Sequence, residues 1–387
     1  MTELAPNPAA ERTRSIDLLR GSVMVLMVLD HARDFFVGTG PGATALATTT
    51  VPLFLTRWIT HFCAPVFVLL AGVSAQLYAR KRGLPAARWF LFTRGLWLVV
   101  LELTIVRFAW IPDPFYRFTL LQVIWALGWS MVVLAGLSYL PRRAVVVIGV
   151  ALVAGHNLLD GFDRGNFGQL EPVWNVIHER AMLKLGARRV FVSYPVLPWI
   201  GVAALGFGLG AWYEKTAAER QRLLIRCGAG ATLAFVALRA LNVYGDPHPW
   251  AAQARGSVFT LLSFLNCEKY PPSLLYLLMT LGPALVVLAL FERLPARAWQ
   301  PIVTFGRVPL FFYVTHLYLL RFSAAPLAVM RFGKSAFQPP PGHAGSPGYP
   351  LWTAYVALVV AVLLLYPACR WFARKKAEAK SPWLSYL

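Results

Sequence analysis

The sequence predicts an all-α, polytopic integral membrane protein, a bundle of about ten transmembrane helices with both termini in the cytoplasm. Hydrophobic residues make up 58% of the 387-residue chain and charged residues only 14%, whereas soluble domains average about 25% charged residues. The mean hydropathy is +0.57. In such a chain a formal net charge of +20 is typical of basic cytoplasmic loops, so no nucleic-acid partner is expected.

Ten segments come close to the length of about 20 mostly apolar residues that a helix needs to cross a bilayer. Glycine and proline inside several of them are tolerated, because neighbouring helices satisfy the freed backbone groups. The first run of apolar residues carries charges, so no cleavable signal peptide is expected. In chain order the segments are 16–36, 52–79, 89–108, 118–139, 143–159 (the shortest), 190–212, 224–242, 272–291, 301–321 and 350–372.

The loops between these segments set the orientation. One set consists of the N-terminus, 80–94, 142–143, 213–226, 293–297 and the C-terminal tail, and it holds twice as many Lys and Arg residues as the opposite set. Such loops are cytoplasmic, and an even number of spans then places both termini there. We therefore expect a cytoplasmic segment at 1–15, a single transmembrane domain at 16–372 and a basic tail at 373–387.

Two loops on the opposite side have distinct patterns. Segment 171–189 places apolar residues near helical spacing with charges between them, which predicts a short helix on the outer surface. Segment 338–350 is rich in proline and glycine and is expected to be irregular. The four cysteines, Cys63, Cys227, Cys267 and Cys369, are scattered without a CxxC motif, so neither a metal site nor a disulfide framework is expected.

The first apolar segment is unusual because it contains six ionisable residues. Ionisable groups inside a membrane helix cost several kcal/mol unless they are paired and serve a function. A polar site built inside the membrane domain is therefore predicted, with this helix contributing to it. The six residues are Asp17, Arg20, Asp30, His31, Arg33 and Asp34.

Other segments bring ionisable side chains to the same predicted outer leaflet. The pattern is expected of a cavity that opens to the outside. Each residue also has a structural interpretation. It either bonds one helix to another or, as a cation, extends its charged end to the membrane–water interface. The residues are Arg57, His61, Arg107, Arg239, Lys269, Tyr270, His316 and Arg321.

The spacing within the first segment predicts specific neighbours. His31 and Asp34 are three residues apart, close enough on a helix for the carboxylate to bond the imidazole and support a general base. Arg20 lies eleven residues before His31, about three turns, on the same face. His156 reads as an interface residue, whereas His178, His248 and His343 read as ordinary surface residues.

The motifs resemble those of membrane acyltransferases. Asp17, Arg20, Gly21 and His31 are similar to the D-x-x-R-G start and following histidine of the acyltransferase-3 family. The chain resembles more closely the bacterial membrane proteins related to heparan-alpha-glucosaminide N-acetyltransferase. That resemblance runs from residue 14 to about 318. It rests on RSIDLLRG, RWITHFCAPVFVLLAGVSA, SYPVLPWIGV, NCEKYPPSLLYLLMTLGP and FGRVPLFFYVTHL.

The resemblance implies a multi-pass acyltransferase of the bacterial inner membrane that uses acetyl-CoA as co-substrate. The acetyl group would pass to a hydroxyl or amine of an extracytoplasmic glycan or of a small amine or alcohol. Both a monomer and a homodimer are compatible with the sequence. The implied catalytic residues are His31, Asp34 and His61, the implied substrate-binding residues are Asp30, Arg107, Lys269, Tyr270 and His316, and Arg20 would contact the donor.

Two alternatives stay open. The lysosomal enzyme of the group carries its key histidine in the first luminal loop, but loop 37–56 here has none, and His61 falls where that enzyme has an aspartate. His31 and His61 are therefore both candidate catalysts. A proton-coupled secondary transporter is the alternative function, although two related halves, frequent in transporters, are not evident.

Overall fold

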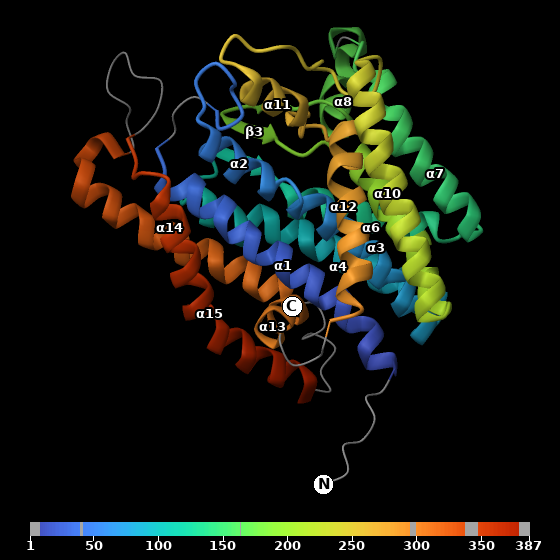
Figure 1. Ribbon diagram of the computed structural model, residues 1–387. Helices are drawn as coiled ribbons and strands as arrows, with labels where there is room; N and C mark the ends of the chain where they lie inside the picture. The colour runs from blue at the N-terminus through green and yellow to red at the C-terminus, as the bar shows by residue number, and fades with distance from the viewer. Residues whose placement is uncertain (1–7, 39–41, 163, 295–298, 337–346, 379–387) are drawn as a thin grey trace. The chain divides into compact units, whose positions relative to one another are not determined.

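The structure is a computed structural model that describes residues 8–38, 42–162, 164–294, 299–336 and 347–378. Helices dominate these residues (Figure 1). The described helices that are long and apolar enough to cross a membrane are Val51–Arg82, Leu84–Trp110, Arg142–Leu159, Ala217–Leu241, Leu274–Phe291, Pro309–Phe332 and Trp352–Glu378. The protein is therefore a multi-pass helical membrane protein, as predicted.

The helices of the predicted segments start late in two of them, 118–139 and 190–212, because both segments begin with a strand. These helices are α1 (Pro8–Phe36), α2 (Val51–Thr60), α3 (Cys63–Arg82), α4 (Leu84–Leu101), α6 (Val123–Leu137), α7 (Arg142–Gly155), α9 (Leu197–Gly210), α10 (Ala217–Leu241), α12 (Leu274–Phe291), α13 (Gln300–Arg307), α14 (Pro309–Phe332) and α15 (Trp352–Glu378). Shorter helices are α5 (Arg107–Trp110), α8 (Glu171–Ile177) and α11 (Ser257–Leu265). Of the ten predicted spans, α1 carries several charges, and α6 and α9 have only 15 and 14 residues.

Two predicted spans are interrupted. The span expected at 301–321 is divided at Val308, which has φ −126° and ψ 51°. Pro309 follows directly and disfavours helical backbone at the residue before it, while it starts α14 well. The span expected at 52–79 breaks between α2 and α3, at His61 and Phe62.

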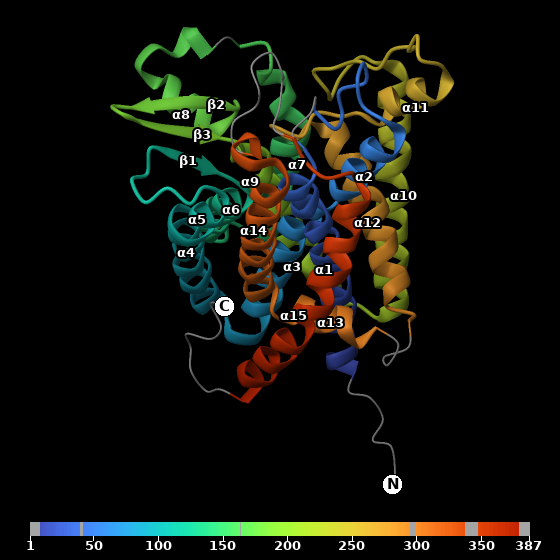
Figure 2. The ribbon, with the colours of Figure 1, turned by 90° about the vertical axis from the view of Figure 1, so that its left-hand side faces the viewer.

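A small sheet departs from the all-α prediction. Its strands β1 (Phe118–Leu121), β2 (Ala181–Leu185) and β3 (Arg188–Val192) lie in the order β1-β3-β2, beyond α5 and α6 in Figure 2. β1 is parallel to β3, and β2 and β3 form a hairpin at Gly186, which has φ +61°. The surface helix predicted at 171–189 is thus wrong beyond Ile177. β-branched and aromatic residues in 188–192 favour a strand, and 181–185 pairs with that strand as a hairpin.

The chain divides into two compact units. The first comprises Met1–Cys63, Ala251–Asn266 and Phe291–Leu387, and the second Ala64–Trp250 and Cys267–Leu290. In the first unit, α1 packs against α13, α14 and α15. In the second, α4 packs on α6, α7 packs on α9, and the sheet adjoins α6.

Glycines allow the helices of the second unit to approach closely. A Cβ at Gly206 of α9 would meet the carbonyl oxygen of Leu69, and one at Gly72 of α3 would meet that of Ala203. Small residues are the usual solution for close crossings in membranes, because packing and not hydrophobicity drives association there. The same reciprocal arrangement occurs at Gly95 with Gly128, Gly149 with Gly201, and Gly228 with Gly282.

We predict opposite effects for two glycine substitutions. Gly206→Ala should lower the free energy of unfolding by about 1–3 kcal/mol, because backbone must shift to admit the methyl group. Gly230→Ala on α10, where a Cβ would meet nothing within 4 Å, should be neutral or stabilise by up to about 1 kcal/mol. Thermal unfolding in detergent measures both; equal midpoints for the two variants would contradict the packing described.

Candidate functional site

Two buried histidines meet in the first unit. His31 of α1 and His316 of α14 place their Nδ1 and Nε2 atoms 2.7 Å apart. The rings are almost parallel, at 5°, with centroids 5.0 Å apart. His316 is fully buried and His31 is 7% exposed, and the ring of Phe312 stacks on His316. An imidazole pair in such surroundings can pass a proton.

The hydrogen bonds assign the proton positions of two neutral rings. His316 Nδ1 lies 2.8 Å from the carbonyl oxygen of Phe312, and a carbonyl can only accept, so this nitrogen carries the hydrogen. His316 Nε2 then has the lone pair and accepts from His31 Nδ1–H. The remaining lone pair of the dyad is on His31 Nε2, the atom that would act as a base.

A buried charge cluster adjoins His31 in the chain. Arg57 of α2 donates to both carboxylate oxygens of Asp30, at 2.6 and 2.7 Å, and Thr60 donates at 2.9 Å. Arg33 lies 3.1 Å from the same carboxylate and 2.5 Å from Asp34. Two acids and two arginines compensate one another, which lets the charges of Asp30 and Arg33 remain buried, while the Asp34 side chain is 34% exposed. The spacing of residues in the sequence did not predict that Arg57 and Thr60 bind Asp30.

The expected bond between His31 and Asp34 is not formed among the described residues. Asp34 pairs with the adjacent Arg33, since a charge-assisted bond to a guanidinium is stronger than one to a neutral imidazole. His31 meets α14 instead. Helical spacing reports neighbours within one helix and carries no information about a partner 285 positions away.

His61, the other candidate catalyst, lies at the break between α2 and α3. It is 3% exposed, and its backbone N–H bonds the carbonyl of Trp58 to close the last turn of α2. A buried histidine at the end of a helix suits either a helix tie or a role in the site. The structure brings His31 and His316 together directly, which singles out that pair.

Arg20 lies toward the start of α1, beside α13. It donates to Asp17 and to the carbonyl of Gly306, both at 3.1 Å. Arg307 is 3.7 Å from the second oxygen of Asp17, and its side chain is 54% exposed. A Cβ at Gly306 would meet the backbone of Asp17, so the two helices touch there. Arg307 is thus an accessible cation, and it was not among the site residues predicted from the sequence.

Arg107, in the second unit, satisfies backbone groups. Its guanidinium donates to the carbonyls of Phe118 and Asp113 and lies 4.1 Å from the centroid of the Tyr116 ring. Glu102, one turn earlier, accepts a bond of 3.2 Å from the backbone N–H of Trp125 at the start of α6. Both side chains complete the backbone where α5, β1 and α6 begin or end, which supports a structural role.

Lys269 and Tyr270 belong to a cationic patch of the second unit. Lys269, 7% exposed, has its Nζ 5.3 Å from the centroid of the Tyr270 ring, and Arg180 lies 5.0 Å from the same ring. Tyr194 meets that ring edge-on at 5.1 Å. Both cations lie close enough to the ring for a cation–π contact, so positive charge is concentrated around Tyr270.

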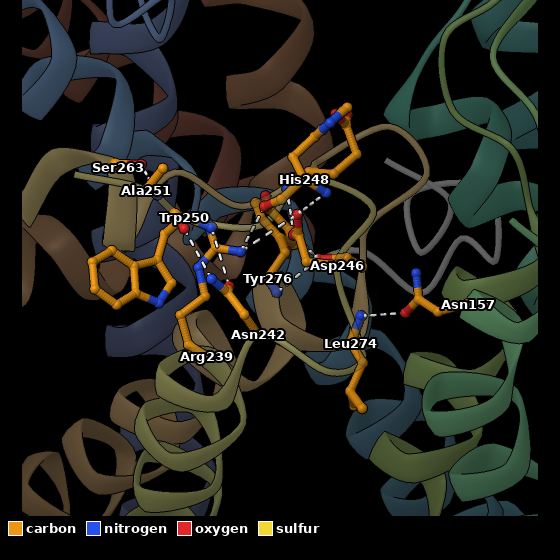
Figure 3. A network of polar contacts seen from close by, with 12 residues as sticks. Asn157, Arg239, Asn242, Asp246, His248, Trp250, Ala251, Ser263, Leu274 and Tyr276 are labelled. Carbon is orange, nitrogen blue, oxygen red and sulfur yellow. Dashed lines mark hydrogen bonds and ion pairs between the residues drawn. The ribbon is translucent and has the colours of Figure 1, made fainter. Parts of the chain in front are cut away.

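Arg239 has a structural partner. It pairs with the buried carboxylate of Asp246 at 3.6 Å and donates to the carbonyl of His248 at 2.8 Å. Figure 3 shows Arg239, Asp246 and His248 in this network. Asp246 also accepts from Ser273 and from the backbone N–H of Glu268. This network holds the loop that leads to Lys269, and it gives Arg239 a buried ion-pair partner.

The prediction for His178 is wrong, because this residue is 3% exposed. Its Nε2 lies 3.1 Å from Asp160, and its ring centroid is 6.1 Å from that of His156. Burial opposes ionisation of Asp160, but hydrogen bonds from His178 and Asn157 outweigh it and lower the pKa of this carboxyl. His248 has a side chain that is 70% exposed, as expected, and His343 lies outside the described residues.

The sequence of the chain matches a known protein family. The family model described as "Heparan-alpha-glucosaminide N-acetyltransferase, catalytic" matches residues 12–245, more than half of the chain. The match includes α1 with His31 and ends before α14 with His316. No curated protein matches the chain significantly. By this match the chain belongs to the heparan-alpha-glucosaminide N-acetyltransferase catalytic family.

Proposed function

We propose that the protein is a membrane acetyltransferase that moves an acetyl group from acetyl-CoA to a hydroxyl or amine, with His31 as general base. The observation that carries this proposal is the buried pair of His31 and His316, whose hydrogen bonds leave the lone pair on His31 Nε2. Membership of the family supports acetyl transfer as the reaction class. His316 acts as the positioning residue that holds the tautomer of His31.

The reaction follows from this tautomer. The acceptor oxygen or nitrogen attacks the thioester carbonyl while His31 Nε2 takes its proton. The charge that develops on His31 is stabilised by His316 Nε2, which still accepts from His31 Nδ1–H. When the tetrahedral intermediate collapses, the carbon–sulfur bond breaks and the thiolate recovers the proton from His31 Nε2. Both imidazoles return to their starting state.

The donor is proposed to reach the pair from the cytoplasm. In the ten-span topology with both termini inside, the start of α1 and the end of α13 face the cytoplasm. Arg307 is accessible there and could bind a phosphate of acetyl-CoA, while Arg20 supports it through Asp17. Arg20 and His31 are eleven residues apart, about 16 Å along the helix, a distance that the extended arm of the donor would have to cover.

The remaining parts of the proposal concern the acceptor and the location. A single domain over 16–372 in a bacterial inner membrane would receive the acceptor from the outer side. The patch of Lys269 and Arg180 on Tyr270 suits an anionic or carbonyl group of a glycan or small amine. Asp30 is assigned to positioning, because its carboxylate is engaged by Arg57, Thr60 and Arg33.

The proposed general base yields a prediction for His31. The wild-type protein in lipid nanodiscs should release free thiol from acetyl-CoA, and His31→Ala should reduce that rate about 10²–10⁴-fold, the usual contribution of a general base. His248→Ala, at an exposed position, serves as the control. Turnover that survives His31→Ala would move the catalytic role to His61. A wild-type protein that neither binds nor turns over acetyl-CoA would favour the transporter.

A second prediction separates the two possible partners of His31. His316→Ala should lower the rate at least about tenfold, a factor that a loss of 1.4 kcal/mol already produces. Asp34→Asn should have a smaller effect, because Asp34 bonds Arg33. The pH dependence of thiol release should change in His316→Ala and stay unchanged in Asp34→Asn. The reverse order of effects would restore the carboxylate as the orienting group.

The charge cluster yields a prediction for stability. Asp30→Asn should lower the free energy of unfolding by about 3–5 kcal/mol, because it leaves the buried Arg57 and Arg33 short of one negative charge. Arg117→Gln, which removes a side chain that is 74% exposed from an ion pair with Asp113, should cost less than about 1 kcal/mol. Similar unfolding midpoints for both variants would show that the cluster does not hold α1 to α2.

A further inference from the structure

An apolar groove lies between α14 and α15 in the first unit, near the end of α14 and the start of α15. Its volume is about 340 Å³, within the range of about 300–1,000 Å³ typical of small-molecule sites. α14 contributes Leu320 and Leu327, and α15 contributes Val356, Val360 and Leu364. The three α15 side chains are 51%, 47% and 60% exposed, so the protein alone does not cover this surface.

The polar residues of the groove are already satisfied by the protein. Ser323 donates to the carbonyl of Leu319 at 2.6 Å, and Tyr349 donates to that of Leu327 at 2.8 Å. Thr353 donates to the carbonyl of Pro350 at 2.7 Å. A site built for a polar ligand directs a few polar groups toward that ligand. A groove whose hydroxyls are turned to the backbone suits a hydrocarbon chain instead.

The mouth of the groove has the composition of a membrane–water interface. Tyr349 contacts the ring of Phe332 edge-on at 5.5 Å, and Trp352 is 63% exposed. Arg331 places its guanidinium 5.0 Å from the centroid of Tyr349 and 5.4 Å from that of Phe332. Tyrosine and tryptophan concentrate at this level of the bilayer. Aromatic faces attract a cation without cancelling its charge.

The backbone fixes this mouth to α1. The backbone N–H of Tyr349 donates to the carbonyl of Phe36 at 2.8 Å, and Val37 and Tyr349 form a parallel bridge. Phe36 also lines the groove. The groove thus has a polar rim, which backbone contacts hold in place, and an apolar interior that runs along two membrane helices. A phospholipid, with a polar headgroup and apolar chains, matches this arrangement.

We propose that this groove binds one acyl chain of an anionic phospholipid, with the lipid phosphate at Arg331. The chain lies along Leu327, Val356 and Val360 and extends toward Leu364, parallel to the helices. The phosphate remains at the interface, where the uncancelled charge of Arg331 meets it. Because Leu320 is one turn from His316 on α14, the bound chain covers the helix that carries half of the histidine pair. The site does not depend on the proposed reaction.

Photocrosslinking tests the proposal. The full chain in nanodiscs receives trace amounts of phosphatidylglycerol with a diazirine at the end of one acyl chain, or phosphatidylcholine with the same chain. After irradiation, peptides are mapped by mass spectrometry. Phosphatidylglycerol should label 309–332 and 347–372 about fivefold more than phosphatidylcholine, the factor expected from about 1 kcal/mol for one arginine near the surface.

Variants separate the chain from the headgroup. Ala357→Trp and Val356→Trp, two lining positions on α15, should each lower the labelling of these segments at least threefold. Val359→Trp, 56% exposed on the same helix but outside the lining, should leave it unchanged. Because there are two groove variants, the test remains valid if one of them misfolds. Arg331→Gln should reduce phosphatidylglycerol labelling to the phosphatidylcholine level.

Three results would overturn the proposal. Labelling spread equally over α7 and α10 would indicate annular lipid only. Labelling that neither groove variant changes would show that the acyl chain binds elsewhere. A preference for phosphatidylglycerol that persists in Arg331→Gln would exclude the headgroup contact. Thiol release from acetyl-CoA is measured separately, so a failure of the lipid site cannot be confused with a failure of the proposed reaction.

Discussion

The buried carboxylate of Asp30 organises the first unit. In an apolar surrounding it must be compensated, and Arg57, Thr60 and Arg33 compensate it within 3.1 Å. This requirement fixes the rotation of α1 relative to α2. Successive residues on a helix point about 100° apart, so the orientation that directs Asp30 to α2 directs His31 to a different neighbour. That neighbour is α14, where His316 accepts its hydrogen bond.

The same helix is also held at its other end, by a close backbone contact. Gly21 and Gly306 let α1 and α13 touch backbone to backbone, and Pro309 separates α13 from α14. A helix held at both ends has little freedom to rotate or slide. The histidine pair benefits, since a hydrogen bond between two imidazoles needs a defined distance and a defined ring plane. In the second unit, by contrast, Glu102, Arg107 and Arg239 complete backbone groups or close a loop.

Much of the helical fold could be predicted from the sequence, because a run of apolar residues with basic flanks is a local signal. The strands at 181–185 and 188–192 were not predicted, since their apolar residues also fit a surface helix and the pairing of β1 with β3 is a long-range event. In the site, His31 and Asp30 were identified from their cost in a membrane helix. His316 and Arg57 were expected at the same leaflet, but their pairing with His31 and Asp30 could not be predicted, because they are distant in the chain. Asp34 had a stronger partner in Arg33.

The parallel pairing of β1 with β3 has a consequence for the order of assembly. The register joins Phe118 to Arg189 and Leu121 to Val192, so β1 leaves the ribosome long before its partner. Until β3 is synthesised, β1 cannot form its backbone hydrogen bonds with that strand. The sheet can therefore form only after the intervening helices α6 and α7 have been synthesised. A chain that stops between α7 and β3 would leave the edge of β1 without β3, and an unpaired strand edge can pair with another chain.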